Sequence, residues 1–295
     1  MTAALNKAGT GDGGNDCNIS RVKSLLRRLR TSARKALGQN FLVDDGVRAT
    51  ILDAAHLSVG DTVVEVGPGL GVLTRAIAEI GCRVIAVELD DTLASMLEKS
   101  LGNWPHVRVL RGDVLSLHAW AEVGPGLPYK VVSNLPYNIA SPTLRRFLES
   151  PRKPSLLVVM VQEEVAEQIA AKPGKMRLLS AIVQYYASAE IIDRVSPESF
   201  FPMPKVSSAV LRLTPHLEPP VKVGDTSSFF SLVAAGFRQP RKQLSNSLSH
   251  GLGVSAIQAT EHLAAAGIDS HRRAETLSLQ EWAGLWKTVY PEEQQ

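Results

Sequence analysis

The chain has 295 residues, of which 44% are hydrophobic and 21% are charged, a composition typical of a globular protein with a substantial core. This composition excludes a wholly disordered chain, a collagen-like repeat and a small disulfide scaffold. The longest apolar run, residues 156–161, is far shorter than the ~20 residues of a membrane span. The beginning of the chain has no apolar run, so we do not expect a secretion signal. Cys17 and Cys82 are far apart and lack metal-ligand spacing, so we expect a reduced, cytoplasmic protein.

The positive charge is concentrated at the beginning of the chain. The formal net charge is +3, but residues 1–37 alone carry +6 and the remainder carries −3. Contacts with a polyanion must therefore come from this N-terminal arm and from local basic clusters.

Residues 1–18 are rich in Gly, Asn and Thr and show no periodicity, so we expect them to be disordered. A short basic amphipathic helix is predicted after them, because apolar residues recur there at helical spacing with Arg and Lys between them. These apolar residues are Ile19, Val22, Leu25, Leu26 and Leu29. We group residues 1–34 as a disordered, basic arm; an Arg-rich transit peptide is the alternative, which Asp12 and Asp16 disfavour.

The next part of the chain alternates strands with helices. We expect helix 45–57, strand 62–66, helix 70–80, strand 83–88, helix 91–101, strands 107–111 and 130–133, helix 142–149, strand 155–161 and helices 163–171 and 178–187. Such alternation is typical of βαβ units, and predicts an α/β fold whose parallel sheet is covered on both faces.

After residue 187 the alternation stops. Two β-rich runs, 190–195 and 207–213, predict an antiparallel hairpin that closes the sheet edge. Pro215, Pro219 and Pro220 mark a linker, and only helical patterns follow: 229–237, 242–250, 256–266 and 279–289. The sequence thus predicts a main domain over residues 35–215 and a helical domain over residues 216–295.

A glycine-rich loop, Gly67-Pro68-Gly69-Leu70-Gly71, connects the strand 62–66 to the following helix. Glycines at this place let a ligand approach the backbone closely. The dinucleotide fingerprint needs a third glycine where Val72 stands. Pro68 also lacks an amide hydrogen for a pyrophosphate. The loop therefore disfavours NAD.

Two carboxylates end the next two strands. Glu88 can accept hydrogen bonds from two ribose hydroxyls, and Asp113 can accept one from an adenine amino group. The loop and these acids suit an adenosine that needs no phosphate contact. The alternative is a glycine-rich turn with two surface acids.

The fourth strand ends in Asn134-Leu135-Pro136-Tyr137. An exocyclic adenine amine is a poor nucleophile because its lone pair is delocalised into the ring. Two acceptors that hold its hydrogens, the Asn134 side-chain oxygen and the Leu135 carbonyl, would draw the nitrogen toward tetrahedral geometry. Pro136 stiffens the turn, and Tyr137 offers a face for base stacking. The alternative is an ordinary turn, since Asn and Pro are common turn residues.

A second aromatic element lies in the predicted hairpin loop, residues 200–206. Phe200 could cover the other face of a flipped base. Capping of the sheet edge is the alternative, and we expect that role for Phe201.

Together these motifs resemble the ribosomal RNA adenine dimethyltransferase family from about Lys35 onward. The matching segments are residues 38–42, 65–69, 88–90, Asp113, 134–139, 200–206, 237–242 and 246–248. The resemblance implies a Rossmann-like methyltransferase sheet with a small, all-helical C-terminal domain that binds RNA or the ribosome. Pro240 departs from the family, which often has a basic residue there.

The resemblance implies S-adenosyl-L-methionine as methyl donor and places it near Asn40, Leu42, Gly67, Gly69, Glu88, Asp113 and Asn134. The catalytic candidates are Asn134, Leu135, Pro136, Tyr137 and Phe200. We expect Arg238, Arg241 and Lys242 to contact RNA.

Within the family the chain is most similar to the bacterial enzyme that dimethylates two adjacent adenosines near the 3′ end of 16S rRNA. The partner implied is the immature small ribosomal subunit, with a monomeric enzyme and no membrane. The alternatives are a large-subunit dimethyltransferase of the macrolide-resistance type, a ribosome-assembly checkpoint protein with secondary catalysis, and an NAD oxidoreductase. The seven histidines are scattered without ligand spacing, so no metal is expected.

Overall fold

The computed structural model describes residues 13–116, 121–122 and 126–293, which divide into two compact units. The first unit comprises the described residues within 1–140, 156–163 and 192–212, and the second comprises those within 141–155, 164–191 and 213–295. The second unit thus includes central parts of the chain besides the helical region that the sequence predicts after residue 216.

Within the described residues the main sheet has seven strands in the order β4-β3-β2-β5-β6-β9-β7. Their bounds are β2 Thr62–Val66, β3 Arg83–Glu88, β4 Val107–Arg111, β5 Lys130–Asn134, β6 Leu156–Gln162, β7 Ala187–Val195 and β9 Ser208–Pro215. The five strands from β4 to β6 pair in parallel. The α/β prediction is therefore confirmed, with expected and observed strands differing by no more than three residues at any end.

The chain reverses its direction of winding at the centre of this sheet. From β2 it continues outward to β3 and β4 on one side, and then returns to add β5 and β6 on the other side. Ligands of open parallel sheets bind outside the carboxyl ends of the strands at such a switch point. The ends of β2, β3 and β5 are therefore the place to look for a site.

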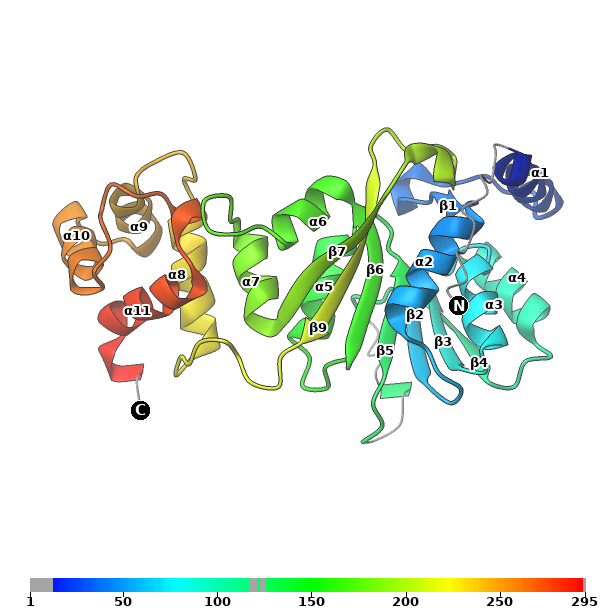
Figure 1. The fold of residues 1–295 in the computed structure, drawn as a ribbon, viewed down its shortest axis with the longest axis horizontal. Coiled ribbons are helices and arrows are strands. Elements are labelled where there is room, and N and C mark those ends of the chain that lie inside the picture. The colour runs from blue at the N-terminus through cyan, green and yellow to red at the C-terminus, as the bar shows by residue number, and fades with distance from the viewer. Residues whose placement is uncertain (1–12, 117–120, 123–125, 294–295) are drawn as a thin grey trace, which may run out of the picture. The chain divides into compact units, whose positions relative to one another are not determined.

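Three helices of the first unit pack on this sheet. Helix α2 (Asp45–Ala55) contacts β5 and β6, α3 (Val72–Glu79) contacts β3, and α4 (Asp91–Leu101) contacts β3 and β4 (Figure 1). Carboxylates fix where two of these helices begin, since Asp44 and Asp90 accept hydrogen bonds from the first backbone amides of α2 and α4. The start of α4 matters for the site, because Asp90 follows Glu88 closely.

The N-terminal segment forms three elements before the first strand of the main sheet. Helix α1 (Gly13–Arg28) is followed by the 3-10 turn η1 (Lys35–Leu37) and the short strand β1 (Phe41–Leu42). The predicted basic helix is confirmed, but the expected disorder of residues 13–18 is wrong because the helix begins at Gly13. The rest of that expectation, residues 1–12, lies outside the described residues.

A two-stranded element not anticipated from the sequence lies beside the main sheet. Strand β1 pairs antiparallel with β8 (Phe200–Phe201). The two β-rich runs of the predicted hairpin, β7 and β9, are neighbours at one edge of the main sheet, with β9 on the inner side. Their burial agrees with this order, since β9 is mostly buried and β7 is mostly accessible.

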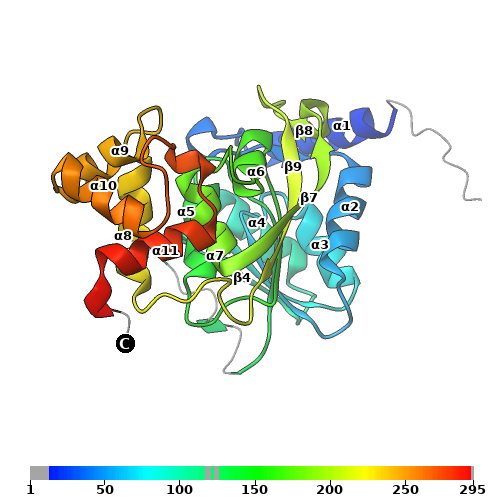
Figure 2. The same ribbon diagram turned by 60° about the vertical axis from the view of Figure 1, so that its left-hand side comes forward.

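The second unit contains helices α5 (Ala140–Leu148), α6 (Glu163–Ile169) and α7 (Leu178–Tyr186) and the C-terminal group α8 (Thr226–Phe237), α9 (Leu244–Leu252), α10 (Ala256–Ala265) and α11 (Leu279–Val289) (Figure 2). The C-terminal group packs around Phe229, Trp282 and Trp286, which are no more than 1% exposed. None of the described helices combines the length and hydrophobicity needed to cross a membrane.

Candidate functional site

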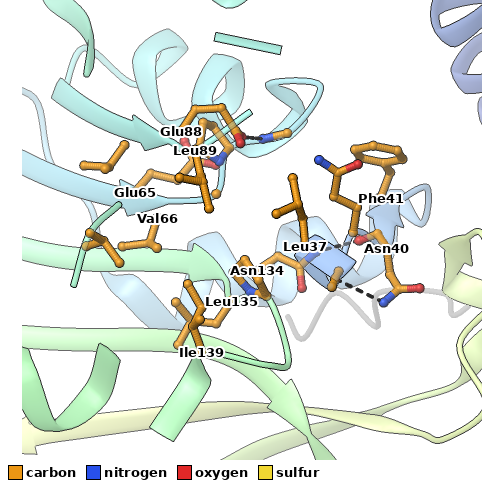
Figure 3. Close-up of a pocket in the computed structure, with 18 of the residues that line it drawn as sticks. Leu37, Asn40, Phe41, Glu65, Val66, Glu88, Leu89, Asn134, Leu135 and Ile139 are labelled. Atoms are coloured by element: carbon orange, nitrogen blue, oxygen red, sulfur yellow. Dashed lines mark hydrogen bonds between the residues drawn. The ribbon is translucent and has the colours of Figure 1, made fainter. Parts of the chain in front are cut away.

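A cavity lies at the carboxyl ends of β2, β3 and β5, where the topology predicts a ligand site. All seven residues that the sequence assigns to the methyl donor line it: Asn40, Leu42, Gly67, Gly69, Glu88, Asp113 and Asn134. Figure 3 shows how Glu88 at the end of β3, Asn134 at the end of β5 and Asn40 beside β1 surround one space.

The glycine loop forms one wall of this cavity. Gly67 and Gly69 have φ angles of 64° and 59°, a conformation that residues with a side chain rarely adopt. A Cβ on Gly67 would lie 3.0 Å from Pro136 Cγ, and one on Gly69 would lie 3.2 Å from the Phe41 ring. These positions thus need glycine both for backbone conformation and for space.

Glu88 has a second task beyond the predicted one. Its Oε2 accepts a hydrogen bond from the Gly69 amide and its Oε1 accepts one from the Asp90 amide, both at 2.9 Å. Burial raises the pKa of this carboxyl, and the two backbone amides partly offset that effect. The carboxyl group therefore fixes the glycine loop to the start of α4, and its remaining lone pairs can accept ligand hydroxyls.

Asp113 lies two residues after the end of β4 and is held by its own turn. Its Oδ1 accepts a hydrogen bond of 2.8 Å from the Leu115 amide. The side chain is only partly buried and lines the cavity. Its other oxygen can accept a hydrogen bond from a ligand amine.

The orientation of the Asn134 amide is set by the N-terminal segment. Asn134 Nδ2 donates a 3.0 Å hydrogen bond to the backbone oxygen of Asn40. The amino side of the amide is thereby occupied, and Oδ1 is the atom left to accept a hydrogen bond. This is the polarity that the sequence argument requires for holding an adenine amine.

The three residues after Asn134 also line the cavity. Leu135 is 1% exposed, and its amide donates to the Met160 oxygen at 3.1 Å. The phenol oxygen of Tyr137 lies 2.5 Å from Ser208 Oγ, and burial raises the pKa of Tyr137. The phenol therefore stays neutral, and its hydrogen bond fixes the ring orientation.

Phe200 does not line this cavity. Its side chain is 2% exposed and belongs to a buried hydrophobic cluster with Leu42, Val195 and Val210. Its neighbour Phe201 is partly accessible. Stacking of Phe200 on a base stays a prediction, and requires that its ring become exposed when RNA binds.

The sequence argument gave no role to two acids that support this site, although both lie in segments that match the family. Glu65 on β2 lines the cavity and is 2% exposed. Asp90 accepts a hydrogen bond from Gln39 Nε2 at 3.2 Å and forms an ion pair with Arg34 at 3.4 Å. The signal available for Asp90 was its helix-capping position after a strand. The signals available for Glu65 were its place inside a strand of a sheet expected to be covered on both faces and its position in the matching segment 65–69.

The predicted RNA contacts lie in the second unit. Arg238, Arg241 and Lys242 are exposed between α8 and α9. Of the other basic pairs, Arg145 forms an ion pair with Glu149, and Lys153 lies over the Tyr186 ring. No group of three or more His, Cys, Asp or Glu suited to a metal ion is found among the described residues.

Comparison with known sequences shows which proteins this chain is similar to. The profile of the ribosomal RNA adenine dimethylase family matches residues 30–289. The ribosomal RNA small subunit methyltransferase A of Dehalococcoides mccartyi (strain ATCC BAA-2266 / KCTC 15142 / 195) is 43% identical over 90% of this chain and 92% of its own. Its namesake from Moorella thermoacetica is 42% identical over 91% of this chain and 96% of its own.

Solved structures of other proteins are similar to this chain as well. The 23S rRNA methyltransferase ErmE is 27% identical, with a TM-score of 0.66 over 85% of this chain and 99% of its own. A dimethyladenosine transferase from Plasmodium falciparum has a TM-score of 0.71 at 21% identity over 86% of this chain and 98% of its own, which supports the fold. Since the family profile covers most of the chain and the close relatives are alike over nearly their full length, the chain belongs to the ribosomal RNA adenine dimethylase family and is an adenine dimethyltransferase of ribosomal RNA.

Proposed function

We propose that the cavity binds S-adenosyl-L-methionine and that the enzyme uses it to dimethylate two adjacent adenosines near the 3′ end of 16S rRNA. The single observation that carries this proposal is the Asn134 amide, whose oxygen is left free at the cavity by the bond from Nδ2 to Asn40. A hydrogen-bond acceptor fixed at this place suits an adenine amine, and would not assist hydride transfer.

The residues of the cavity fit an adenosine-containing donor. Gly67 and Gly69 line the cavity without a side chain, and a Cβ at either position would press on Pro136 or Phe41. Glu88 would accept hydrogen bonds from the ribose hydroxyls, and Asp113 would accept one from the adenine amine. Asn40 and Leu42 would close the opposite wall. When bound, the donor supplies an electrophilic methyl group.

The chain's own residues prepare the nucleophile. Asn134 Oδ1 and the Leu135 carbonyl hold the hydrogens of the target amine, which localises the nitrogen lone pair. Pro136 keeps the turn rigid, so that both acceptors are in place before the base arrives. No strong base is required, because the amine becomes acidic once methylated and releases its proton readily. A monomethylated amine retains one hydrogen for either acceptor, so a second transfer at the same site is allowed.

Tyr137 provides the stacking face for the target base. Its ring lines the cavity, and its hydroxyl is held by Ser208, so that the ring is preorganised. Phe200 would complete the stack on the other side after a rearrangement that exposes it.

The identity of the close relatives supports the small-subunit substrate. The small-subunit enzymes are 42–43% identical to this chain, whereas the large-subunit enzyme is 27% identical. We further propose that the physical substrate is the immature small subunit and that the enzyme works as a monomer in the cytoplasm. Outside residues 1–37 the chain carries −3, so it should not bind arbitrary RNA strongly through charge alone. Phosphate contacts by separate basic patches, including Arg238, Arg241 and Lys242, would position a folded particle.

The test is to offer the enzyme and labelled donor to immature small subunits, naked 16S rRNA and 23S rRNA, with Asn134→Ala as the inactive control. Mass spectrometry should find four methyl groups per immature particle and little on the other two substrates. Efficient methylation of 23S rRNA would instead assign the enzyme to the large-subunit branch. Equal activity on naked 16S rRNA would reject the particle requirement.

A further inference from the structure

The N-terminal segment presents a basic face that the methylation chemistry does not use. Seven bases lie between residues 19 and 35, and all seven are exposed: Arg21, Lys23, Arg27, Arg28, Arg30, Arg34 and Lys35. No acidic residue occurs between residues 17 and 43. Among the described residues, an ion pair is found only for Arg34, with Asp90. The face therefore carries positive charge that the protein itself leaves largely uncompensated.

The apolar side of the same helix is buried against the first unit. Val22 and Leu26 are each 6% exposed and pack in one cluster with Phe41, Val43 and Leu70. The Asn18 side chain donates a 2.7 Å hydrogen bond to the backbone oxygen of Val43. The helix is thus a docked element with a fixed orientation, and its bases project from a defined surface.

This surface adjoins the active-site cavity. Phe41 and Leu70, which share the buried cluster with α1, also line the cavity. The ammonium of Lys23 lies 5.3 Å from the centre of the Phe201 ring, next to the β1–β8 pair. Figure 1 shows α1 on the side of the first unit where β1 lies.

We propose that the exposed basic face of residues 19–35 binds phosphates of the rRNA that flanks the adenine in the cavity. The proposal rests on the ribosomal RNA substrate of the family, and it concerns a part of the chain that mostly precedes the family match, which begins at residue 30. The contact is with the backbone and carries no sequence information, so it positions the RNA while the cavity selects the base.

An anionic membrane fits this face less well. A helix that lies on a membrane inserts its apolar side among the lipids, and here that side is occupied by protein contacts of Val22 and Leu26. What α1 and the residues that follow it offer to a ligand is exposed positive charge, and this suits a polyphosphate backbone.

The experiment neutralises charge without removing the helix, because deletion would also remove the buried Val22 and Leu26. The test variant combines Arg21→Gln, Arg27→Gln, Arg28→Gln and Arg30→Gln. A control removes the same charge elsewhere at exposed lysines for which the structure gives no ion pair, with Lys99→Gln, Lys172→Gln, Lys175→Gln and Lys222→Gln. Two double variants, Arg21/Arg27 and Arg28/Arg30, serve if the fourfold variant folds poorly, as judged by donor binding and thermal unfolding.

The readout is the salt dependence of affinity for 16S and 23S rRNA fragments. Each lost phosphate contact should lower the slope of log K against log salt by roughly 0.7–0.9, so the fourfold variant should lose about 3 and each double variant about half of that. Donor affinity should not change. An unchanged slope, or an equal loss in the lysine control, would overturn the proposal. Unchanged RNA binding with lost binding to anionic phospholipid vesicles would assign the face to membranes. Because the comparison is between variants on each RNA, it holds whichever subunit the enzyme methylates.

Discussion

The buried carboxyl group of Glu65 should make the stability of the folded protein depend on pH. Its carboxyl group lies on β2 and is 2% exposed, and Oε2 has no hydrogen-bond partner among the described residues. Burial raises its pKa to about 8, and the nearby charge of Glu88 adds to the effect while the Thr74 hydroxyl lowers it. The folded protein should therefore hold a proton at this carboxyl at neutral pH.

The direction of the pH effect follows from proton binding. In the unfolded chain Glu65 has its ordinary pKa of 4.5. Between pH 4.5 and about 8 the folded state binds the proton and the unfolded state does not, so the free energy of unfolding falls as the pH rises. One pKa unit corresponds to about 1.4 kcal/mol. Between pH 5.5 and pH 7.5 the loss from this one group should be about 2–3 kcal/mol.

Glu65→Gln keeps the shape of the protonated side chain and cannot ionise, so it should remove this loss. Urea unfolding of both proteins followed by circular dichroism at pH 5.5 and pH 7.5 measures the effect. The stability of the variant relative to wild type should rise by about 2–3 kcal/mol between the two pH values. Burial also raises the pKa of Glu88; Glu65→Gln leaves Glu88 in place, so the contribution of Glu88 should largely cancel in the comparison. Parallel pH profiles would show that Glu65 is ionised in the folded protein and that the reasoning is wrong.

Glu88→Ala should weaken donor binding by roughly 2–3 kcal/mol in calorimetry, since it removes charged hydrogen bonds; an unchanged affinity would contradict the ribose role. Asn134→Ala should lower the single-turnover methylation rate by about 10²–10³, by analogy with the loss of one group that stabilises a transition state, with little change in RNA affinity; a near wild-type rate would exclude the acceptor role. Tyr137→Ala should weaken binding of the target base by about 1–3 kcal/mol, whereas Tyr137→Phe keeps the ring and should lose much less in the same titration. Phe200→Ala should lower the free energy of unfolding by about 3–5 kcal/mol, and a chemical denaturation that shows full stability would contradict its burial.

Much of the fold could be predicted because local and global signals agree. The expected bounds of β2, β3, β4, α4 and α11 coincide with those observed. Most of these elements are delimited by Gly, Asp or Ser at their ends, and the strands carry β-branched residues throughout. The place of the cavity was equally accessible to sequence reasoning, because successive parallel strands bring their ends to one edge. Gly67, Glu88 and Asn134 could thus be brought together without any knowledge of distances.

The elements that were missed depend on contacts between distant residues. The β1–β8 pair joins two-residue strands about 160 positions apart, which is too short for any periodic signal. The beginning of α1 at Gly13 was also missed, and this helix too packs against residues that are distant in the sequence. Residues 13–18 have poor helix propensity. Helical stability in proteins comes mostly from tertiary packing, which Val22 and Leu26 provide for this helix.

The arrangement around Asn134 shows why a list of residues that line one cavity does not yet describe a mechanism. The sequence indicates an amide at the end of β5, but an amide presents either a donor or an acceptor to a ligand. The orientation of the amide is fixed by a residue 94 positions earlier in the chain, because Asn134 Nδ2 donates a hydrogen bond to the backbone oxygen of Asn40. Asn40 directly precedes β1, and Phe41 of β1 packs against Gly69 and belongs to the cluster that anchors α1.

A perturbation of the N-terminal segment should therefore change the methylation rate through the orientation of Asn134. Val22→Ala, which leaves every base of α1 in place, should slow single-turnover methylation while the salt dependence of RNA binding stays unchanged. The fourfold arginine variant should show the opposite pattern, and the two effects should separate cleanly if anchoring and charge are independent tasks of this helix.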